Sequence, residues 1–143
     1  MSFGWSAGDL VAALSFVHNL YKAFDDYTGV RGEYRDTVMF LRSLIRTLEP
    51  LKTFADWPGN AHPRYATDIQ EQVVLLRTPI NVFIQNIRKF EPSLGWKAKK
   101  GRYRNVVRKV QWYLDISKKV LTLKSKIEMH MRVLDTLLQR LTL

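Results

Sequence analysis

The hydrophobic side chains of this chain recur at alternating spacings of four and three residues along nearly its whole length. That spacing places them on one face of an α-helix, whereas a half-buried strand would alternate at every second residue. The first series consists of Leu10, Leu14, Val17, Tyr21 and Phe24. Because 143 residues suffice for one core and are too few for two, the sequence predicts a single all-α domain over residues 1–143.

Further series predict the remaining helices. The second runs over Tyr34, Val38, Leu41, Ile45 and Leu48, and the third over Ile69, Val73, Leu76, Ile80, Phe83, Ile87 and Phe90. A shorter basic helix is expected from about Tyr103 to Leu114, with Val107, Val110 and Leu114 as its core face. A long final helix follows, with its stripe at Val120, Leu123, Ile127, Leu134, Leu137 and Leu141. The spacing leaves open whether these two helices separate near Asp115–Ser117 or form one. Four or five such helices predict an antiparallel bundle with a long C-terminal helix.

The start of the first helix has its own signals. Ser6 is a good N-cap residue, and Asp9 three positions later makes a pair that resembles a capping box. Trp5 and Leu10 occupy the two positions of a hydrophobic staple, which fixes the direction in which the chain enters a helix. The sequence therefore predicts that the first helix begins just after Ser6.

Positive charge is concentrated in one segment. The formal net charge is +10, but residues 1–96 hold ten basic and ten acidic side chains, and residues 127–143 hold two of each. The excess therefore lies within residues 97–126, where eleven basic side chains accompany one acid, Asp115. A local surplus indicates an anionic partner at that place, since an adaptation for solubility would spread the charge.

Patterns that support catalysis are missing from the sequence. There is no cysteine, no glycine-rich phosphate loop, and no partner at metal-ligand spacing for His18, His62 or His130. His130 and His18 lie beside apolar stripes, where a hydrogen-bonded structural histidine is the more frequent case. We therefore expect a protein that is not an enzyme and that needs no cofactor or metal.

The basic segment has four open interpretations. Its predicted anion-binding residues are Lys97, Lys99, Lys100, Arg102, Arg104, Arg108, Lys109, Lys118 and Lys119. Interleaved tryptophans and tyrosines suit a membrane surface, where basic residues attract headgroups and aromatic rings lie at the interface. Nucleic acid would use the same charges with base stacking. The third interpretation is a nuclear-localisation signal, and the fourth is a solvated face whose aromatic residues belong to the core.

The first helix is the second unusual feature. Asp9 is the one charged side chain between Met1 and Tyr21. About 20 residues of helix can cross a bilayer core, although Ser6, Ser15, His18 and Asn19 make this segment a poor permanent membrane span. The alternative is the best-buried helix of the bundle. Both interpretations hold if the helix is buried at rest and released later, as in a bistable bundle.

Two stretches of the chain also resemble a known family. The opening Met-Ser-Phe-Gly-Trp-Ser-Ala-Gly-Asp of residues 1–9 is similar to that of a fungal N-terminal helical domain of NLR-like receptors and ubiquitin-like-domain proteins. The similarity continues through the first helix and Gly32-Glu33-Tyr34, and returns at Trp112, Lys118-Lys119-Val120, Leu123, Lys126-Ile127 and His130. Such domains resemble the HeLo and HeLo-like bundles of fungal incompatibility systems, which in turn resemble the cell-death executioner bundles of animals and plants.

This resemblance implies an innate-immunity or programmed-cell-death domain that is cytoplasmic at rest, is recruited to the plasma membrane on activation, and then damages it. The implied membrane-insertion residues are Phe3, Trp5, Leu10, Val11, Leu14, Val17 and Tyr21. The implied partners are anionic membrane lipids, further copies of the chain and a receptor or adaptor protein. The preferred hypothesis is therefore a signalling domain that binds anionic lipid through residues 97–126 and inserts its first helix as an oligomer. The first rival is an interaction module without membrane activity, and nucleic-acid binding is the second.

Overall fold

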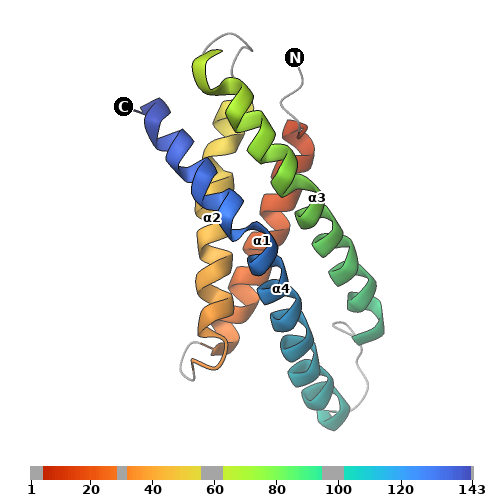
Figure 1. The fold of residues 1–143 in the computed structure, drawn as a ribbon. Helices are drawn as coiled ribbons and strands as arrows, with labels where there is room; N and C mark the ends of the chain where they lie inside the picture. Colours follow the sequence, from red (N-terminus) through yellow and green to blue (C-terminus); the bar gives the residue numbers. More distant parts are fainter. Residues whose placement is uncertain (1–4, 29–31, 56–62, 95–101, 143) are drawn as a thin grey trace.

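Four helices account for nearly all of the residues that the structure, a computed structural model, describes: residues 5–28, 32–55, 63–94 and 102–142. The helices are α1 (Ala7–Thr28), α2 (Arg35–Ala55), α3 (Pro63–Leu94) and α4 (Arg102–Thr142), and these described ranges contain no strand (Figure 1). The prediction of an all-α bundle with a long C-terminal helix is confirmed. Side chains are described within 5–27, 32–52, 67–89 and 109–140.

Local signals place the helix starts as expected. Ser6 caps α1, because its Oγ accepts a hydrogen bond from the backbone N–H of Asp9 at 3.1 Å, and its carbonyl accepts one from Leu10 at 2.9 Å. Trp5, directly before the cap, is buried in the core. Before α2 the chain turns at Gly32, whose φ of 66° is the left-handed conformation that glycine adopts without strain.

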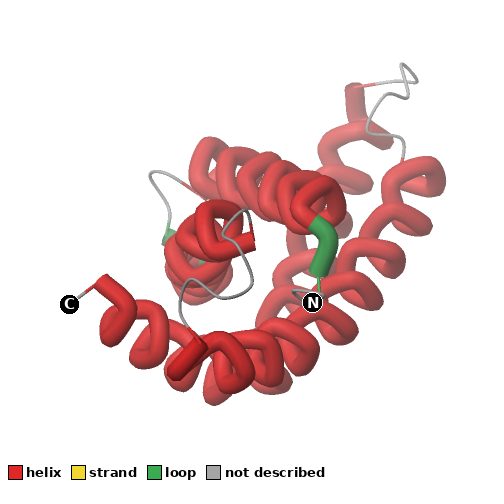
Figure 2. Tube along the Cα trace, turned by 90° about the horizontal axis from the view of Figure 1, so that it is seen from above, coloured by secondary structure: helices red, strands yellow, loops and turns green. Residues whose placement is uncertain are grey.

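The residues Asp115–Ser117 do not separate two helices. α4 is one helix of 41 residues, which makes it about 60 Å long at 1.5 Å per residue. In Figure 1 the ribbon of α4 continues as one helix from its teal start to its dark blue end, and Figure 2 shows the described residues almost entirely as helix. Ile116 and Ser117 are buried, so the middle of α4 packs on the rest of the bundle. The alternative that the sequence left open is therefore resolved in favour of one long helix.

Neighbouring helices follow the order α1, α2, α4, α3 around the bundle. The chain forms two antiparallel hairpins, α1–α2 and α3–α4, which pack together mainly through α2 and α4, while α3 touches α1 more slightly. Both α2 and α4 run from the lower to the upper end of the view in Figure 1, so they are parallel neighbours. The molecule thus has an α2–α4 layer on one side and an α1–α3 layer on the other.

Most of the predicted stripes form the core. The predicted stripes of α1 and α3 are buried wherever their side chains are described, except that Tyr21 is only partly buried. The stripe of α4 is likewise buried from Val120 onward. In α2 the buried face is broader than predicted. The sequence analysis omitted Phe40, Leu44 and Leu51, which are buried, whereas Val38 and Ile45 lie at the edge. The reason is that α2 packs on two neighbours, α1 and α4.

The prediction for the start of α4 is wrong. Val110 and Leu114 were expected to face the core, but they are 45% and 40% exposed. Trp112 and Tyr113 point inward instead, because one continuous helix must keep the register set by its buried residues further along. At this end of the bundle Trp112 and Tyr113 pack against Phe24 of α1, with ring centroids 6.0 and 5.0 Å away.

Candidate functional site

Most of the predicted insertion residues are core residues of the folded protein. Trp5, Leu10, Leu14 and Val17 are buried. Tyr21 is partly buried, Phe3 lies outside the described residues, and Val11 is 50% exposed. Helix α1 therefore presents its apolar face to the bundle, and its insertion into any other apolar medium requires it to leave the core.

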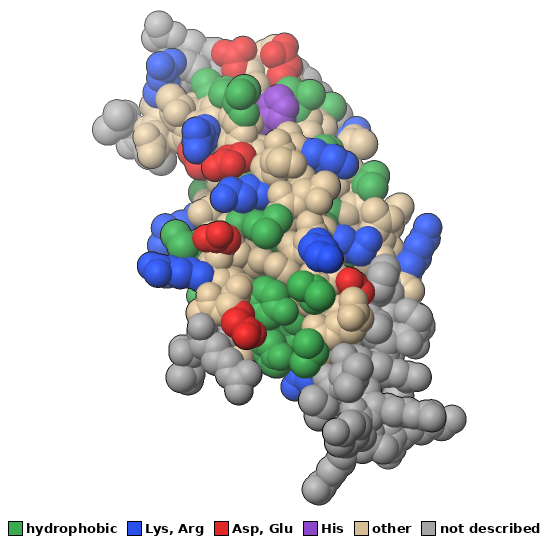
Figure 3. All heavy atoms as spheres, turned by 60° about the horizontal axis from the view of Figure 1, so that its bottom comes forward, with side chains coloured by type: hydrophobic (Ala, Val, Ile, Leu, Met, Phe, Trp, Pro, Cys, Tyr) green, Lys and Arg blue, Asp and Glu red, His purple; other side chains and the backbone are tan. Residues whose placement is uncertain are grey.

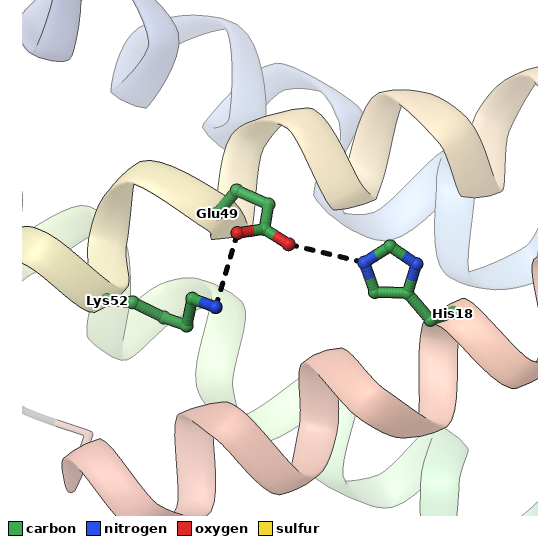
Figure 4. A network of polar contacts seen from close by, with 3 residues as sticks. All are labelled: His18, Glu49 and Lys52. Atoms are coloured by element: carbon green, nitrogen blue, oxygen red, sulfur yellow. Dashed lines mark hydrogen bonds and ion pairs between the residues drawn. The ribbon is translucent and has the colours of Figure 1, made fainter.

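Polar and cation–π contacts fasten α1 to its two neighbours. Nε2 of His18 lies 3.2 Å from Oε1 of Glu49 on α2, and Nζ of Lys52 lies 3.4 Å from the other oxygen of the same carboxylate (Figure 4). The hydrogen bond from His18 is the main reason why the pKa of Glu49 lies below its ordinary value. On the other side, the guanidinium carbon of Arg88 on α3 lies 5.6 Å from the ring centre of Phe16. These contacts lie at the surface or are partly exposed. A half-buried hydrogen bond, from the hydroxyl of Tyr113 on α4 to the carbonyl oxygen of Ala23 at 3.1 Å, also holds α1.

Of the predicted anion-binding residues, the structure describes the side chains of three, and these three lie along α4. Lys97, Lys99 and Lys100 lie outside the described residues. Arg102, Arg104 and Arg108 belong to the first turns of α4, but their side chains are not among those described. Lys109 and Lys118 are exposed, and Lys119 is partly buried.

An exposed apolar stripe runs beside these lysines. Val110, Leu114 and Leu121 are exposed at spacings of four and seven residues, which places them on one side of α4. Lys118 is one turn beyond Leu114, and Lys124 is one turn beyond Leu121. This part of α4 therefore carries a mixed basic and apolar face on the side away from the core.

A groove of about 310 Å³ separates this face from α2. Its walls include Met39, Phe40 and Ser43 of α2 and Lys124, Met131 and Arg132 of α4. Asp36, Glu128 and Asp135 also line it, but Glu128 is paired with Arg132 at 3.0 Å and Asp135 accepts a hydrogen bond from Thr47 at 2.9 Å. Burial raises the pKa of Asp135, and the bond from Thr47 opposes that effect.

The order of the helices separates charge across the bundle. Together α2 and α4 hold fourteen basic and five acidic side chains, a net charge of +9, whereas α1 and α3 hold five basic and six acidic ones, a net charge of −1. On the face drawn in Figure 3, Lys and Arg side chains lie interspersed with acidic ones, and a hydrophobic patch lies in the lower part of the view. Sequence analysis found the basic half of α4 but missed the contribution of α2, namely Arg35, Arg42 and Arg46. Their spacing of seven and four residues was the available signal.

The described residues hold neither a candidate membrane span nor a candidate metal-ion cluster. Over the ranges that the structure describes, no helix combines the length and the apolar character that a membrane span requires. Nor does any group of three His, Asp or Glu side chains there lie close enough together to hold a metal ion.

Comparison with protein-family models, with curated proteins and with solved structures finds no match for this chain.

Proposed function

We propose that this protein is a membrane-targeting signalling domain of the cell-death type. It binds anionic lipid through the basic side of α4, gathers into an oligomer and then inserts α1. The observation that carries the proposal is the charge difference between the two layers of the bundle, +9 against −1. The opening motif of residues 1–9 and its resemblance to HeLo-like domains supply the cell-death part of the proposal.

Electrostatic attraction accounts for the first step. A basic residue near an anionic leaflet contributes about 1 kcal/mol, and the attraction decays within a Debye length of about 10 Å. A charge that is confined to one side of the bundle therefore orients the whole domain. The exposed Val110, Leu114 and Leu121 add apolar contact at the level of the headgroups.

Insertion of α1 is the costly second step. Burial of a large apolar side chain is worth about 1.5–3 kcal/mol, so release of Leu10, Leu14 and Val17 into water opposes the step strongly. A bilayer core buries the same side chains again and offsets most of that cost. What remains is lost packing, the contacts of His18 and Phe16, and the cost of bringing the carboxyl of Asp9 into the membrane, all of which an activating oligomer must outweigh.

The exposed residue Val11 allows a test that leaves the core intact. Val11→Glu puts a charge on the α1 surface, and Val82→Glu on α3 is a matched control, because the two valines are 50% and 48% exposed. Both variants should bind vesicles of equal parts phosphatidylcholine and phosphatidylserine. Dye release should be lost in Val11→Glu and kept in Val82→Glu, because a charge at the centre of a bilayer is costly.

The vesicle assay also contains the outcomes that contradict the proposal. Dye release that survives Val11→Glu contradicts insertion of α1. No binding of the unaltered protein to anionic vesicles contradicts lipid targeting itself. Circular dichroism of each variant confirms that the helices persist.

The alternative function is a protein-interaction module without membrane activity. The observation in its favour is a second set of exposed apolar side chains, which lies on α3 and α4: Leu75, Val82, Met129 and Val133. Such a module predicts a mass that rises with concentration in light scattering and no binding to anionic vesicles.

A further inference from the structure

Helix α2 presents a stripe of arginines that is not part of the lipid-binding surface proposed for α4. Arg35, Met39, Arg42 and Arg46 follow one another at spacings of four, three and four residues, so they share one side of the helix. All four are exposed, and Met39 is 56% exposed. An exposed methionine among three arginines is a mixed basic and apolar surface like that of α4.

We infer that this α2 stripe forms the second half of a lipid-docking face, on which Arg35, Arg42 and Arg46 bind the headgroups of an anionic bilayer. The inference rests on the proposed function, and it assigns the orientation of the docked protein. Helices α2 and α4 both lie along the membrane surface, and the α1–α3 layer faces away from it.

The groove between α2 and α4 shows that the two stripes are adjacent. Met39 lines this groove together with Lys124 and Arg132 of α4. Arg35 and Arg42 lie one turn before and one turn after Met39 on α2, and Leu121 lies one turn before Lys124 on α4. Met39 of α2 and Lys124 of α4 therefore face the same groove, which Asp36, Glu128 and Asp135 also line. Arg35, Arg42 and Leu121 lie within about one turn of Met39 or Lys124.

The three arginines are available to bind an anion. Among the described side chains, the carboxylates that form ion pairs are those of Glu49 and Glu128, and neither pairs with an arginine of the α2 stripe. A guanidinium can donate two parallel hydrogen bonds to one phosphate or carboxylate group, so the chemistry of the stripe fits anionic lipid headgroups.

The character of the apolar residues favours a bilayer over nucleic acid. Single-stranded nucleic acid is held by aromatic side chains on which bases stack. Among the side chains that the structure describes along this face, the aromatic residues Phe40, Trp112 and Tyr113 are buried. The exposed apolar side chains are aliphatic, as in Met39 and Leu121, and such side chains enter the boundary between headgroups and acyl chains.

Paired charge removals test the stripe. Arg42→Gln/Arg46→Gln removes two charges from α2, and Lys22→Gln/Lys89→Gln removes two exposed charges from α1 and α3 as the matched control. Each basic residue close to an anionic surface contributes about a fivefold factor. The α2 variant should therefore lower the partition coefficient onto phosphatidylcholine–phosphatidylserine vesicles about thirtyfold, and the control should lower it less than about threefold.

Fluorescent labels test the orientation directly. The chain has no cysteine, so Met39→Cys and Val82→Cys each supply one attachment site for an environment-sensitive dye, at positions of similar exposure. On addition of the vesicles the emission at position 39 should shift to the blue and that at position 82 should not.

The outcomes separate this inference from the proposed function. Suppose that the unaltered protein binds anionic vesicles. If the α2 variant and its control then weaken binding equally, the α2 face is overturned while lipid targeting stands. The same holds if the dye emission shifts to the blue at position 82 and not at position 39. If the unaltered protein does not bind the vesicles, both are overturned. Binding to an oligonucleotide in place of the vesicles also overturns both and assigns the face to nucleic acid.

Discussion

The hydroxyl oxygens of Thr37 and Ser117 lie 2.6 Å apart inside the core, although the two residues are 80 positions apart in the chain. Their hydrogen bond joins α2 to α4, which are both positively charged. Two like-charged helices repel each other, so buried polar and apolar contacts between them must outweigh that repulsion. The bond also fixes the register in which the two basic helices lie side by side.

A double-mutant cycle measures this bond. Thr37→Val or Ser117→Ala alone leaves one buried hydroxyl without its partner and should cost about 1–3 kcal/mol of unfolding free energy. The double variant should cost less than the sum, by about 1 kcal/mol, in urea denaturation. Thr122→Val is a suitable control, because this exposed hydroxyl bonds within its own helix, and its cost should stay within about 0.5 kcal/mol. Additive single effects would show that the two hydroxyls do not interact.

The carboxyl of Asp135 should make stability depend on pH. Burial raises its pKa in the folded protein above the ordinary 3.8, so the folded state holds this proton more tightly than the unfolded state. The stability that this group supplies is present below pH 3.8 and is lost as the pH rises through the folded pKa. Asp135→Asn should therefore gain stability relative to the unaltered protein as the pH rises from 3 to 7, as measured by urea denaturation at each pH. A difference that stays constant or shrinks over this range contradicts the assignment.

The His18 contact should be visible in the titration of Glu49. Its pKa lies below the ordinary 4.5, so this carboxylate stabilises the fold above that pH and loses its effect as the pH falls through the lowered value. In a carbon-detected NMR titration, His18→Ala should move the pKa of Glu49 up toward 4.5. Lys52→Gln should also move it up, because Lys52 both bonds to the carboxylate and attracts it electrostatically. An unchanged pKa of Glu49 in His18→Ala would contradict the assignment of the His18 hydrogen bond as the largest single cause.

Because α4 is continuous, a glycine at its middle should lower the free energy of unfolding. In a helix interior glycine is about 1 kcal/mol less favourable than alanine. Asp115→Gly should therefore be less stable than Asp115→Ala by about that amount in thermal or urea unfolding, since both variants lose the bond from Gln111 equally. Equal stability of the two variants would indicate that the chain is not helical at this position.

The positions of the helices could be predicted from the sequence better than which side of each helix is buried. The cap at Ser6 and the stripe of α3 are confirmed because they depend on neighbours within one turn. Val110 and Leu114 were assigned to the wrong side of α4, since a short stretch of helix read alone does not reveal the register that Ile116 and Val120 impose further along. Three or four apolar residues at helical spacing define one side of a helix, but they do not show whether that side faces the core or the solvent.

The proposed docking face could not be predicted from the sequence, because it depends on which helices are neighbours. Arg35, Arg42 and Arg46 are visible as a stripe in the sequence, but nothing in the spacing says that α4 lies beside α2. Polar pairs such as Thr47 and Asp135, which are 88 positions apart, help to set that order. The partner of a buried polar group becomes known only from the assembled bundle.

The division into two hairpins has a consequence for folding kinetics. Within α1–α2 and within α3–α4 the contacts join segments that are close in the chain, so each hairpin closes a short loop and forms quickly. The helices of the α1–α2 hairpin carry no net charge, whereas those of the α3–α4 hairpin carry a net charge of +8. The slow step of folding is then the docking of a neutral hairpin onto a strongly basic one, and added salt should change its rate little, because no net repulsion between the two units is there to be screened.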